Sequence, residues 1–228
     1  MRETERVFVV LYDIHGNLPA LEAVLAEVEA AGADRYLLGG DYCTPSPWPQ
    51  ETLARLRELP NATWIRGNAE RWLREPPVDR PEVMASYDLF HGSLPDEDNE
   101  WLYSLETQAE LDGILYVHGS PLSDVESFAP EPQDGEERML AGVRDRTVVF
   151  GHSHQQFRRA GPDGTDLVNP GSVGMPLDGD PRAAWATWDG DFEFNRTGYD
   201  HERAAEAYRA FGGRLGEVFG NRILRGSD

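Results

Sequence analysis

Seven side chains with oxygen or nitrogen donor atoms closely follow apolar stretches of this chain. Such stretches are typical of buried strands, and the carboxyl ends of strands in an open α/β sheet meet at one edge, where ligands bind. Carboxylate, amide and imidazole groups are donors for divalent cations, and seven of them, one a carboxylate able to bridge, are about what two adjacent cations need. The residues are Asp13, His15, Asp41, Asn68, His118, His152 and His154.

The spacing of these donors is the spacing that repeated strand–helix units produce. Asp41 follows Asp13 by 28 residues, and Asn68 follows Asp41 by 27. Apolar residues at helical spacing predict a helix over Leu18–Ala31, which completes a βαβ unit, and a second helix over Glu51–Leu59. The expected strands before the donors are Val7–Leu11, Tyr36–Leu38, Thr63–Ile65, Ile114–Val117 and Val148–Phe150.

Each donor also has an ordinary structural interpretation. His152 and His154 alternate by two, so a buried pair on one face of a strand would show the same spacing. His118 follows an apolar strand, as a hydrogen-bonded core histidine would, and Asn68 after Gly67 suits a left-handed turn. The coincidence of all these residues at strand ends favours metal binding over separate explanations.

Other residues near the motifs have roles that the sequence leaves open. His91 and His201 fit no ligand pattern and are expected at the surface, and Cys43 is expected to pack. Trp48, in a proline-rich loop, could stack on a nucleobase or aryl group or cover apolar surface. The segment Asn169–Gly174 could bind phosphate through backbone N–H groups or form a tight turn between strands.

Composition predicts a soluble globular protein in the cytoplasm. Its 228 residues suit one substantial α/β domain, no apolar run approaches a membrane span, and residues 1–6 are charged, unlike a signal peptide. The single cysteine suits a reducing compartment. The net charge of −20 argues against long-range attraction of nucleic acids or anionic membranes, so a phosphate site must create positive potential locally, as bound cations do. Nothing in the sequence predicts the oligomeric state.

The pattern changes after the third expected strand and then returns to strands. Segment 71–110 is partly proline-rich, with a short helix expected over Asp98–Leu105, and we interpret it as an excursion within a single domain that spans 1–228. A helical tail is expected over 200–228, with a helix at Glu202–Phe211 and a frayed end at Gly220–Asp228. Expected late strands and hairpin turns are Ala183–Trp188, Phe192–Phe194, Asp112-Gly113, Asp163-Gly164 and Asp189-Gly190.

Taken together, these segments resemble the calcineurin-like metallophosphoesterases, and most of all their compact bacterial and archaeal phosphodiesterase branch, which includes diadenosine tetraphosphatase-like proteins. The resemblance extends from Val7 to about Asp200 and includes the late segments Asn169–Gly174 and Asp178–Arg182 in the expected order. It implies a four-layer αββα sandwich with mixed sheets and a small helical excursion. It also implies two divalent metal ions at the strand ends and hydrolysis of a small phosphate ester.

The resemblance further implies a role for each donor. One metal ion would bind Asp13, His15 and His154, the second would bind Asn68, His118 and His152, and Asp41 would bridge them. A hydroxide between the metals would be the nucleophile, because two cations lower the pKa of a shared water and neutralise charge at phosphorus. Asn17 would donate to the phosphate, and Glu70 would orient the ligands. A site without thiolate suits Mn, Fe, Co, Ni or Zn, with Mn favoured.

One position departs from the family pattern. Many relatives carry a His after the Gly-Asn pair, where it protonates the leaving group or binds phosphate, and this chain has Ala69 there. Because general acid catalysis contributes roughly 10²–10⁴-fold, Ala69 favours phosphodiesters with leaving groups that need little protonation. The alternatives are a phosphomonoesterase acting on nucleotides or phosphoproteins, a metal-binding scaffold module of the same fold, and a mononuclear metalloenzyme outside the family.

Overall fold

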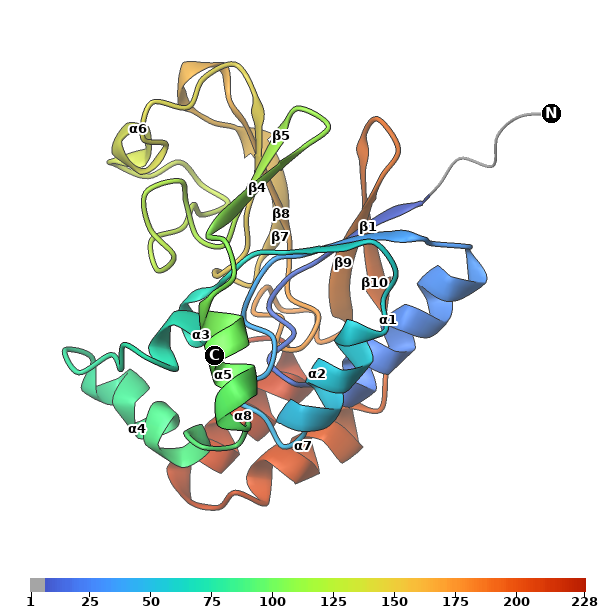
Figure 1. The fold of residues 1–228 in the computed structure, drawn as a ribbon, viewed down its shortest axis with the longest axis vertical. Helices are drawn as coiled ribbons and strands as arrows, with labels where there is room; N and C mark the ends of the chain where they lie inside the picture. The colour runs from blue at the N-terminus through green and yellow to red at the C-terminus, as the bar shows by residue number, and fades with distance from the viewer. Residues whose placement is uncertain (1–6) are drawn as a thin grey trace.

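Within residues 7–228, two five-stranded mixed sheets pack face to face and carry helices on their outer faces (Figure 1). The computed structural model describes these residues, so the expectation about residues 1–6 lies outside the described part. The first sheet contains β10 Phe192–Thr197, β9 Ala183–Trp188, β1 Phe8–Leu11, β2 Arg35–Leu38 and β3 Ala62–Trp64, in that order. The second contains β4 Gln108–Leu111, β5 Ile114–Val117, β6 Thr147–Val149, β8 Asp166–Pro170 and β7 Gln156–Ala160. The predicted sandwich fold is confirmed.

Alternation of side chains along β1 creates the layers. Val9 packs with the helices α1 (Leu18–Ala30) and α2 (Pro49–Arg57), whereas Val10 lies in the core between the sheets. Successive side chains of a strand point to opposite faces, so one strand serves both layers. The outer face of the second sheet is covered by the short helix α6 (Glu136–Met139) and the chain that precedes it.

The donor loops share one edge because the strands before them run parallel within each sheet. β1 pairs in parallel with β2, and β2 with β3, while β5 pairs in parallel with β6. The carboxyl ends of these strands therefore point the same way. For the five strands before the donors, the predicted bounds differ from the observed bounds by one residue or none at each end, which is within the usual uncertainty of element ends. The late strand expected over Phe192–Phe194 is longer than predicted and continues to Thr197.

The segment between β3 and β4 is more helical than the sequence predicts. It contains α3 (Asn68–Trp72), α4 (Pro81–Phe90) and α5 (Asp96–Tyr103). Neither α3 nor α4 was expected, and α5 corresponds to the helix predicted over Asp98–Leu105. Pro81 stands in the first turn of α4, where a missing N–H and a fixed φ suit a helix. Phe90, at the end of α4, packs on Phe211 and Phe219, with ring centroids 4.6 and 6.1 Å away.

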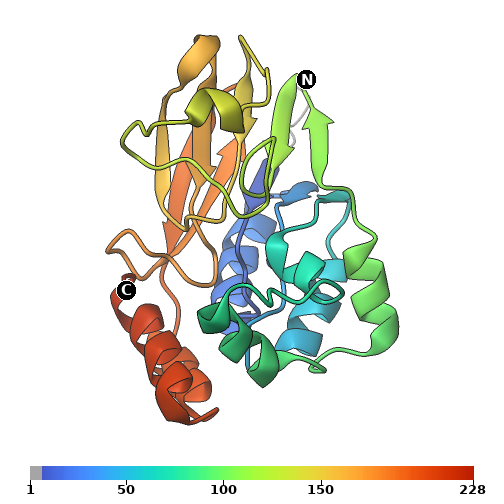
Figure 2. The same ribbon diagram turned by 90° about the vertical axis from the view of Figure 1, so that its left-hand side faces the viewer.

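The C-terminal residues form a packed helix pair, so the prediction that Gly220–Asp228 would fray is wrong. Helices α7 (His201–Arg209) and α8 (Gly213–Arg225) lie side by side beyond one end of the sheets (Figure 2). Ile223 is fully buried. A Cβ at Gly220 would lie 2.7 Å from Cγ of Arg209, so glycine allows the two helices to approach closely.

Three further expectations concern turns, domains and membranes. The predicted turns Asp112-Gly113, Asp163-Gly164 and Asp189-Gly190 each join antiparallel neighbours and are confirmed. The assignment of 1–228 to one domain, with 71–110 as an excursion and 200–228 as a helical tail, stays a prediction. In the described residues, no helix has both the length and the apolar character needed to cross a membrane.

Candidate metal centre

The loops after the strands hold their donor residues in a left-handed backbone conformation. The φ angles of Asp13, His15, Asp41, His152 and His154 are 52°, 46°, 55°, 65° and 58°. Positive φ is uncommon outside glycine and costs on the order of 1–3 kcal/mol per residue, and such residues cluster at functional sites. These tight turns direct side chains from separate strands to one point.

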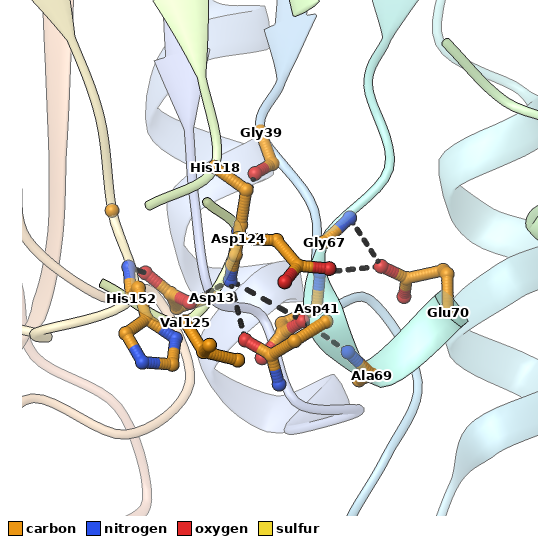
Figure 3. Close-up of polar contacts among 12 residues, drawn as sticks. Asp13, Gly39, Asp41, Gly67, Ala69, Glu70, His118, Asp124, Val125 and His152 are labelled. Carbon is orange, nitrogen blue, oxygen red and sulfur yellow. Dashed lines mark hydrogen bonds and ion pairs between the residues drawn. The ribbon is translucent and has the colours of Figure 1, made fainter. Parts of the chain in front are cut away.

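All seven predicted donors come together at this point. Asp13, His15 and His154 form one group and Asp41, His118 and His152 a second, and within each group the possible ligand atoms lie within 4.8 Å of one another. The side-chain oxygen of Asn68 lies 3.0 Å from Nε2 of His118. Figure 3 shows Asp13, Asp41, His118 and His152 converging from different strand ends.

Two imidazole nitrogens of the first group face each other at a short distance. Nδ1 of His15 lies 2.6 Å from the carbonyl oxygen of Thr44, and Nδ1 of His154 lies 2.7 Å from that of Met175. A carbonyl only accepts, so in each neutral ring the proton is on Nδ1 and Nε2 carries a lone pair. These two Nε2 atoms are 3.0 Å apart, and a cation is the partner that such a pair lacks.

The second group has a similar arrangement. Nδ1 of His118 donates to the carbonyl of Gly39 at 2.9 Å, so in the neutral ring Nε2, which lies 3.0 Å from the oxygen of Asn68, presents a lone pair. If the side-chain amide of Asn68 were rotated by 180°, its nitrogen would donate to His118 and, at 2.7 Å, to Nδ1 of His152. A cation in this group would instead need the amide oxygen of Asn68 as its ligand. Oδ1 of Asp13 is buried without a hydrogen-bond partner, 3.5 Å from Nε2 of His154. The residues present therefore fit bound cations.

Asp41 lies between the two groups. Its Oδ2 is 3.8 Å from Nε2 of His15, and its Oδ1 is 3.4 Å from Nε2 of His118. One oxygen thus faces each group, which is the arrangement that a bridging carboxylate requires. Oδ1 also accepts the backbone N–H of Ala69 at 2.8 Å, which fixes the orientation of the carboxylate.

Burial and mutual charge set the protonation of the site. Burial lowers the pKa of His152 to about 3, and the nearby His118 adds to the effect. Burial also acts to lower the pKa of His118, but Asp41 and Asp13 outweigh it and raise this pKa to about 8. Burial would raise the pKa of Asp13, yet the surrounding imidazoles hold it below its ordinary value, so this carboxylate is ionised. The pocket of carboxylates stabilises positive charge.

Glu70 and Asp124 support the second group from outside it. The carboxylate of Glu70 accepts the backbone N–H groups of Asp41, Tyr42 and Gly67 at 2.8–2.9 Å, which joins the loops that carry Asp41 and Asn68 (Figure 3). Asp124 forms a bidentate ion pair with Arg71 of α3, at 2.6 and 2.9 Å, beside His118 and His152. Sequence reasoning expected the role of Glu70 and missed Asp124, which lies in an irregular segment that no motif marks.

Asn17 does not face the donors as the resemblance implied. It is fully buried, and its amide nitrogen donates to the carbonyl of Gly174 and to the hydroxyl of Tyr199, at 2.8 and 3.1 Å. Its oxygen accepts the backbone N–H of Ala20 at 3.3 Å, so Asn17 caps helix α1. In this structure both amide hydrogens are therefore used within the protein rather than presented to a phosphate.

The segment Asn169–Gly174 forms an internal brace. The backbone N–H of Gly174 and the hydroxyl of Ser172 both donate to the carbonyl of Asp13, at 3.1 and 2.6 Å. The backbone N–H of Gly171 is bound by the side chain of Asn169 at 2.8 Å. The Gly174 N–H and the Ser172 hydroxyl hold the loop of Asp13, and the Gly171 N–H is used within the segment. These contacts agree with the interpretation of the segment as a structural turn.

The remaining residues that the sequence singled out lie elsewhere. Cys43 is buried in the core under the first sheet, as expected. Trp48 lines a separate surface hollow with Tyr199 and does not line the pocket beside the donors. His91 is exposed as expected, but it lines that pocket, and His201 is partly buried against Tyr199.

Comparison with known proteins agrees with the fold and the site. The sequence matches the calcineurin-like phosphoesterase superfamily domain over residues 7–191. It is 27% identical to an uncharacterized protein of Methanocaldococcus jannaschii, over 96% of this chain and 98% of that protein. A metallophosphoesterase from Sphaerobacter thermophilus has a similar structure, with a TM-score of 0.77 and 25% identity over 96% of this chain and 99% of the other.

A more distant structure shows the fold alone. YfcE, a phosphoesterase from E. coli, aligns with a TM-score of 0.52 and 21% identity, over 81% of this chain and 89% of its own. The sandwich, the two buried His/Asp groups and the match over most of the sequence define the class: this chain belongs to the calcineurin-like phosphoesterase superfamily.

Proposed function

We propose that this chain is a dinuclear metal-dependent hydrolase of phosphodiesters, with Mn²⁺ as its favoured metal. The observation that carries the proposal is the 3.0 Å distance between Nε2 of His15 and Nε2 of His154, which present facing lone pairs when both rings are neutral. Beside them lies the buried Oδ1 of Asp13, which accepts no hydrogen bond. Bound divalent cations would supply Lewis acidity at the phosphate and a water of lowered pKa as nucleophile.

The protein's own residues then hold and orient this centre. Asp13, His15 and His154 provide one cation site, and His118, His152 and the oxygen of Asn68 provide the other. Asp41 joins the sites through its two oxygens. The backbone carbonyls of Thr44, Gly39 and Met175 keep three of the imidazoles in the tautomer whose Nε2 is free.

Charge favours a diester over a monoester. A monoester carries close to two negative charges near neutral pH, and the chain already has a net charge of −20. None of the described residues that line the pocket beside the site is an Arg, and the chain contains no Lys, so this pocket offers no Arg or Lys side chain for the second charge. The guanidinium of Arg71, near the second group, is already engaged by Asp124. Ala69 in that pocket also offers no acid for a basic leaving group.

The donor chemistry favours Mn²⁺ over Mg²⁺. Four imidazoles take part, and imidazole suits transition metals, whereas Mg²⁺ prefers an octahedron of oxygens. The only cysteine is buried away from the site, so a thiolate-preferring metal has no soft donor there.

The test combines metal counting with a substrate panel. Protein stripped by a chelator is reloaded with Mn²⁺ or Mg²⁺, its metal content is measured, and it is assayed on diesters, cyclic nucleotides, dinucleoside polyphosphates and monoesters. We expect two metal ions per chain, better recovery with Mn²⁺, and faster diester than monoester turnover. One metal per chain, or faster monoester turnover, would contradict the proposal.

The bridge is tested by Asp41→Asn. Because Asp41 faces both groups, this substitution should reduce turnover more than loss of any other single donor and should lower metal content below two. The matched control is Asp134→Asn at an exposed position, which should retain both metals and full turnover. Two metals and near-normal turnover in Asp41→Asn would show that Asp41 is not the bridge.

A further inference from the structure

A pocket opens directly beside the proposed cation sites. On one side it is lined by residues of both groups, His15, Asp41 and Asn68. Its other wall is formed by residues in and next to helices α3 and α4. These helices lie in the chain segment that connects β3 of the first sheet with β4 of the second (Figure 1). The pocket therefore gives a group attached to a phosphate at the site space to extend along this wall.

The far wall is aromatic and apolar. It contains Trp72 and Leu73 from α3, and Tyr87, Phe90 and His91 from α4 and its C-terminal end. The rings of Tyr87 and His91 are stacked, with centroids 5.2 Å apart and planes 11° apart. Flat rings of this kind present a surface on which another planar ring packs favourably.

The wall is held in place rather than loosely attached. Phe90 is buried and packs against two rings of the C-terminal segment, Phe211 and Phe219. One turn earlier in the same helix, Tyr87 faces the pocket. The C-terminal helices thus position α4 and, through it, the aromatic wall.

Ala69 takes up little space among the lining residues of the pocket. It follows Asn68 directly and lines the cavity with a single methyl group. The charged lining is limited as well, because no Arg occurs among the described lining residues and the chain has no Lys. Ser86 and the exposed His91 provide hydrogen-bonding groups at the pocket. The space therefore suits a planar group that is uncharged and carries a few polar atoms.

We propose that this pocket binds the planar ring carried by the alcohol portion of the substrate ester, the ring of a phenol or the base of a nucleoside, and that Tyr87 is the residue that selects for it. The proposal rests on the phosphoesterase function proposed above and specifies its substrate class. A second phosphate of a polyphosphate chain would find no cationic partner on this wall and is disfavoured.

Selectivity is measured with two methyl phosphate diesters whose leaving alcohols have similar acidity, one a phenol and the other a fluorinated alkyl alcohol. This match removes the intrinsic advantage of an aryl leaving group. Tyr87→Ala should raise KM for the aryl ester about tenfold, as expected for loss of one ring contact, and should leave the alkyl ester unchanged. Tyr87→Phe, which keeps the ring, should resemble the parent protein.

The matched control is Leu89→Ala on the same helix. Leu89 is exposed and does not line the pocket. Its truncation should change KM for neither ester, and circular dichroism and metal content should be the same in all three variants. An equal rise in KM for both esters in Tyr87→Ala, or an effect of the same size in Leu89→Ala, would overturn the proposal.

A binding measurement separates the pocket from the chemistry. Adenosine and ribose, which have no phosphate to hydrolyse, are titrated calorimetrically into parent, Tyr87→Ala and Leu89→Ala proteins. Adenosine should bind to parent and Leu89→Ala, at least about tenfold more weakly to Tyr87→Ala, and ribose to none. Adenosine binding of this kind without ester hydrolysis would uphold the pocket and contradict the proposed function. Ester hydrolysis together with adenosine binding that is absent or insensitive to Tyr87 would uphold the proposed function and contradict the proposed role of the pocket.

Discussion

Glu70 is the residue whose removal tests the architecture of the centre most directly. Its carboxylate is buried and accepts three backbone N–H groups from two loops, two of them, from Asp41 and Gly67, at Oε2 and one, from Tyr42, at Oε1. The change Glu70→Gln keeps the shape but turns one acceptor oxygen into a donor. At best the new amide oxygen retains two of the bonds, and its NH₂ group then faces the N–H of Tyr42.

The magnitude follows from these contacts. A buried N–H left without an acceptor costs about 1–3 kcal/mol, and a hydrogen bond to a charged group loses about 1 kcal/mol when the acceptor becomes neutral. One orphaned N–H and two weakened bonds together amount to roughly 3–5 kcal/mol. Burial of the carboxylate raises the pKa of Glu70, and a neutral amide avoids that penalty. The net loss of unfolding free energy should be about 2–4 kcal/mol.

Urea unfolding of metal-free protein measures this loss, and a metal titration measures the effect on the site. Supporting partners of metal ligands typically contribute about 10–100-fold to metal affinity, so Glu70→Gln should bind Mn²⁺ that much more weakly. Glu131→Gln, at an exposed position, is the control and should change neither quantity. Stability within about 0.5 kcal/mol of the parent together with unchanged metal affinity would refute the reasoning.

Three further predictions address the packing and the chemistry. Gly174→Ala should lower the unfolding free energy by at least about 3 kcal/mol or prevent folding, because the new Cβ would lie 1.8 Å from the carbonyl oxygen of Ile14, whereas Gly198→Ala has open space and should be tolerated in the same thermal unfolding assay. Ile223→Ala, at a fully buried position of α8, should cost about 2–5 kcal/mol in urea unfolding, and a C-terminus that contributes no stability would instead leave the midpoint unchanged. Ala69→His should flatten the dependence of turnover on the basicity of the leaving alcohol across a series of aryl and alkyl esters, and a parent protein without such dependence would show that another group supplies the proton.

The sheet and the donor set could be predicted because their patterns are local. Apolar runs of three to five residues followed by Asp, Asn or His mark strand ends in any parallel sheet. Because the carboxyl ends of the strands meet, His118 and His152 lie close to Asp13 although nothing in the intervening sequence indicates this contact. The turns at Asp112-Gly113 and Asp163-Gly164 were equally visible, since this pair favours a hairpin wherever it occurs.

The helices that were missed or truncated depend on tertiary contacts. Helix α8 contains Gly216 and Gly220, which weaken a helix on its own by about 1 kcal/mol each. Here both glycines allow close contact with α7. An argument from helix propensity alone counts these same residues against the helix. Helix α4 begins at a proline that, in a proline-rich stretch, resembles a loop signal. In both cases packing decided the structure, through Phe219 and Phe90 respectively.

The roles of individual polar side chains were the least predictable. Asn17 has the residue type and place expected for a phosphate donor, but its oxygen caps α1 and its amide nitrogen donates to Gly174 and Tyr199. Asp124 gained its role only because the fold brings it to Arg71, which lies 53 positions away in the sequence. A residue type limits what a side chain can do, and its neighbours in space decide which of those roles it takes.

The strained loops of the centre have an energetic cost. Five donors in left-handed conformations, at on the order of 1 kcal/mol or more each, represent a cost comparable with the whole stability of a typical domain, about 5–15 kcal/mol. Backbone bonds from Asp13, His15 and Gly16 to the carbonyls of residues 40–42 offset part of it. The rest is maintained by the sandwich, which holds these five residues in their loops. The strain in the loops therefore serves to direct donor atoms from separate strands toward one point.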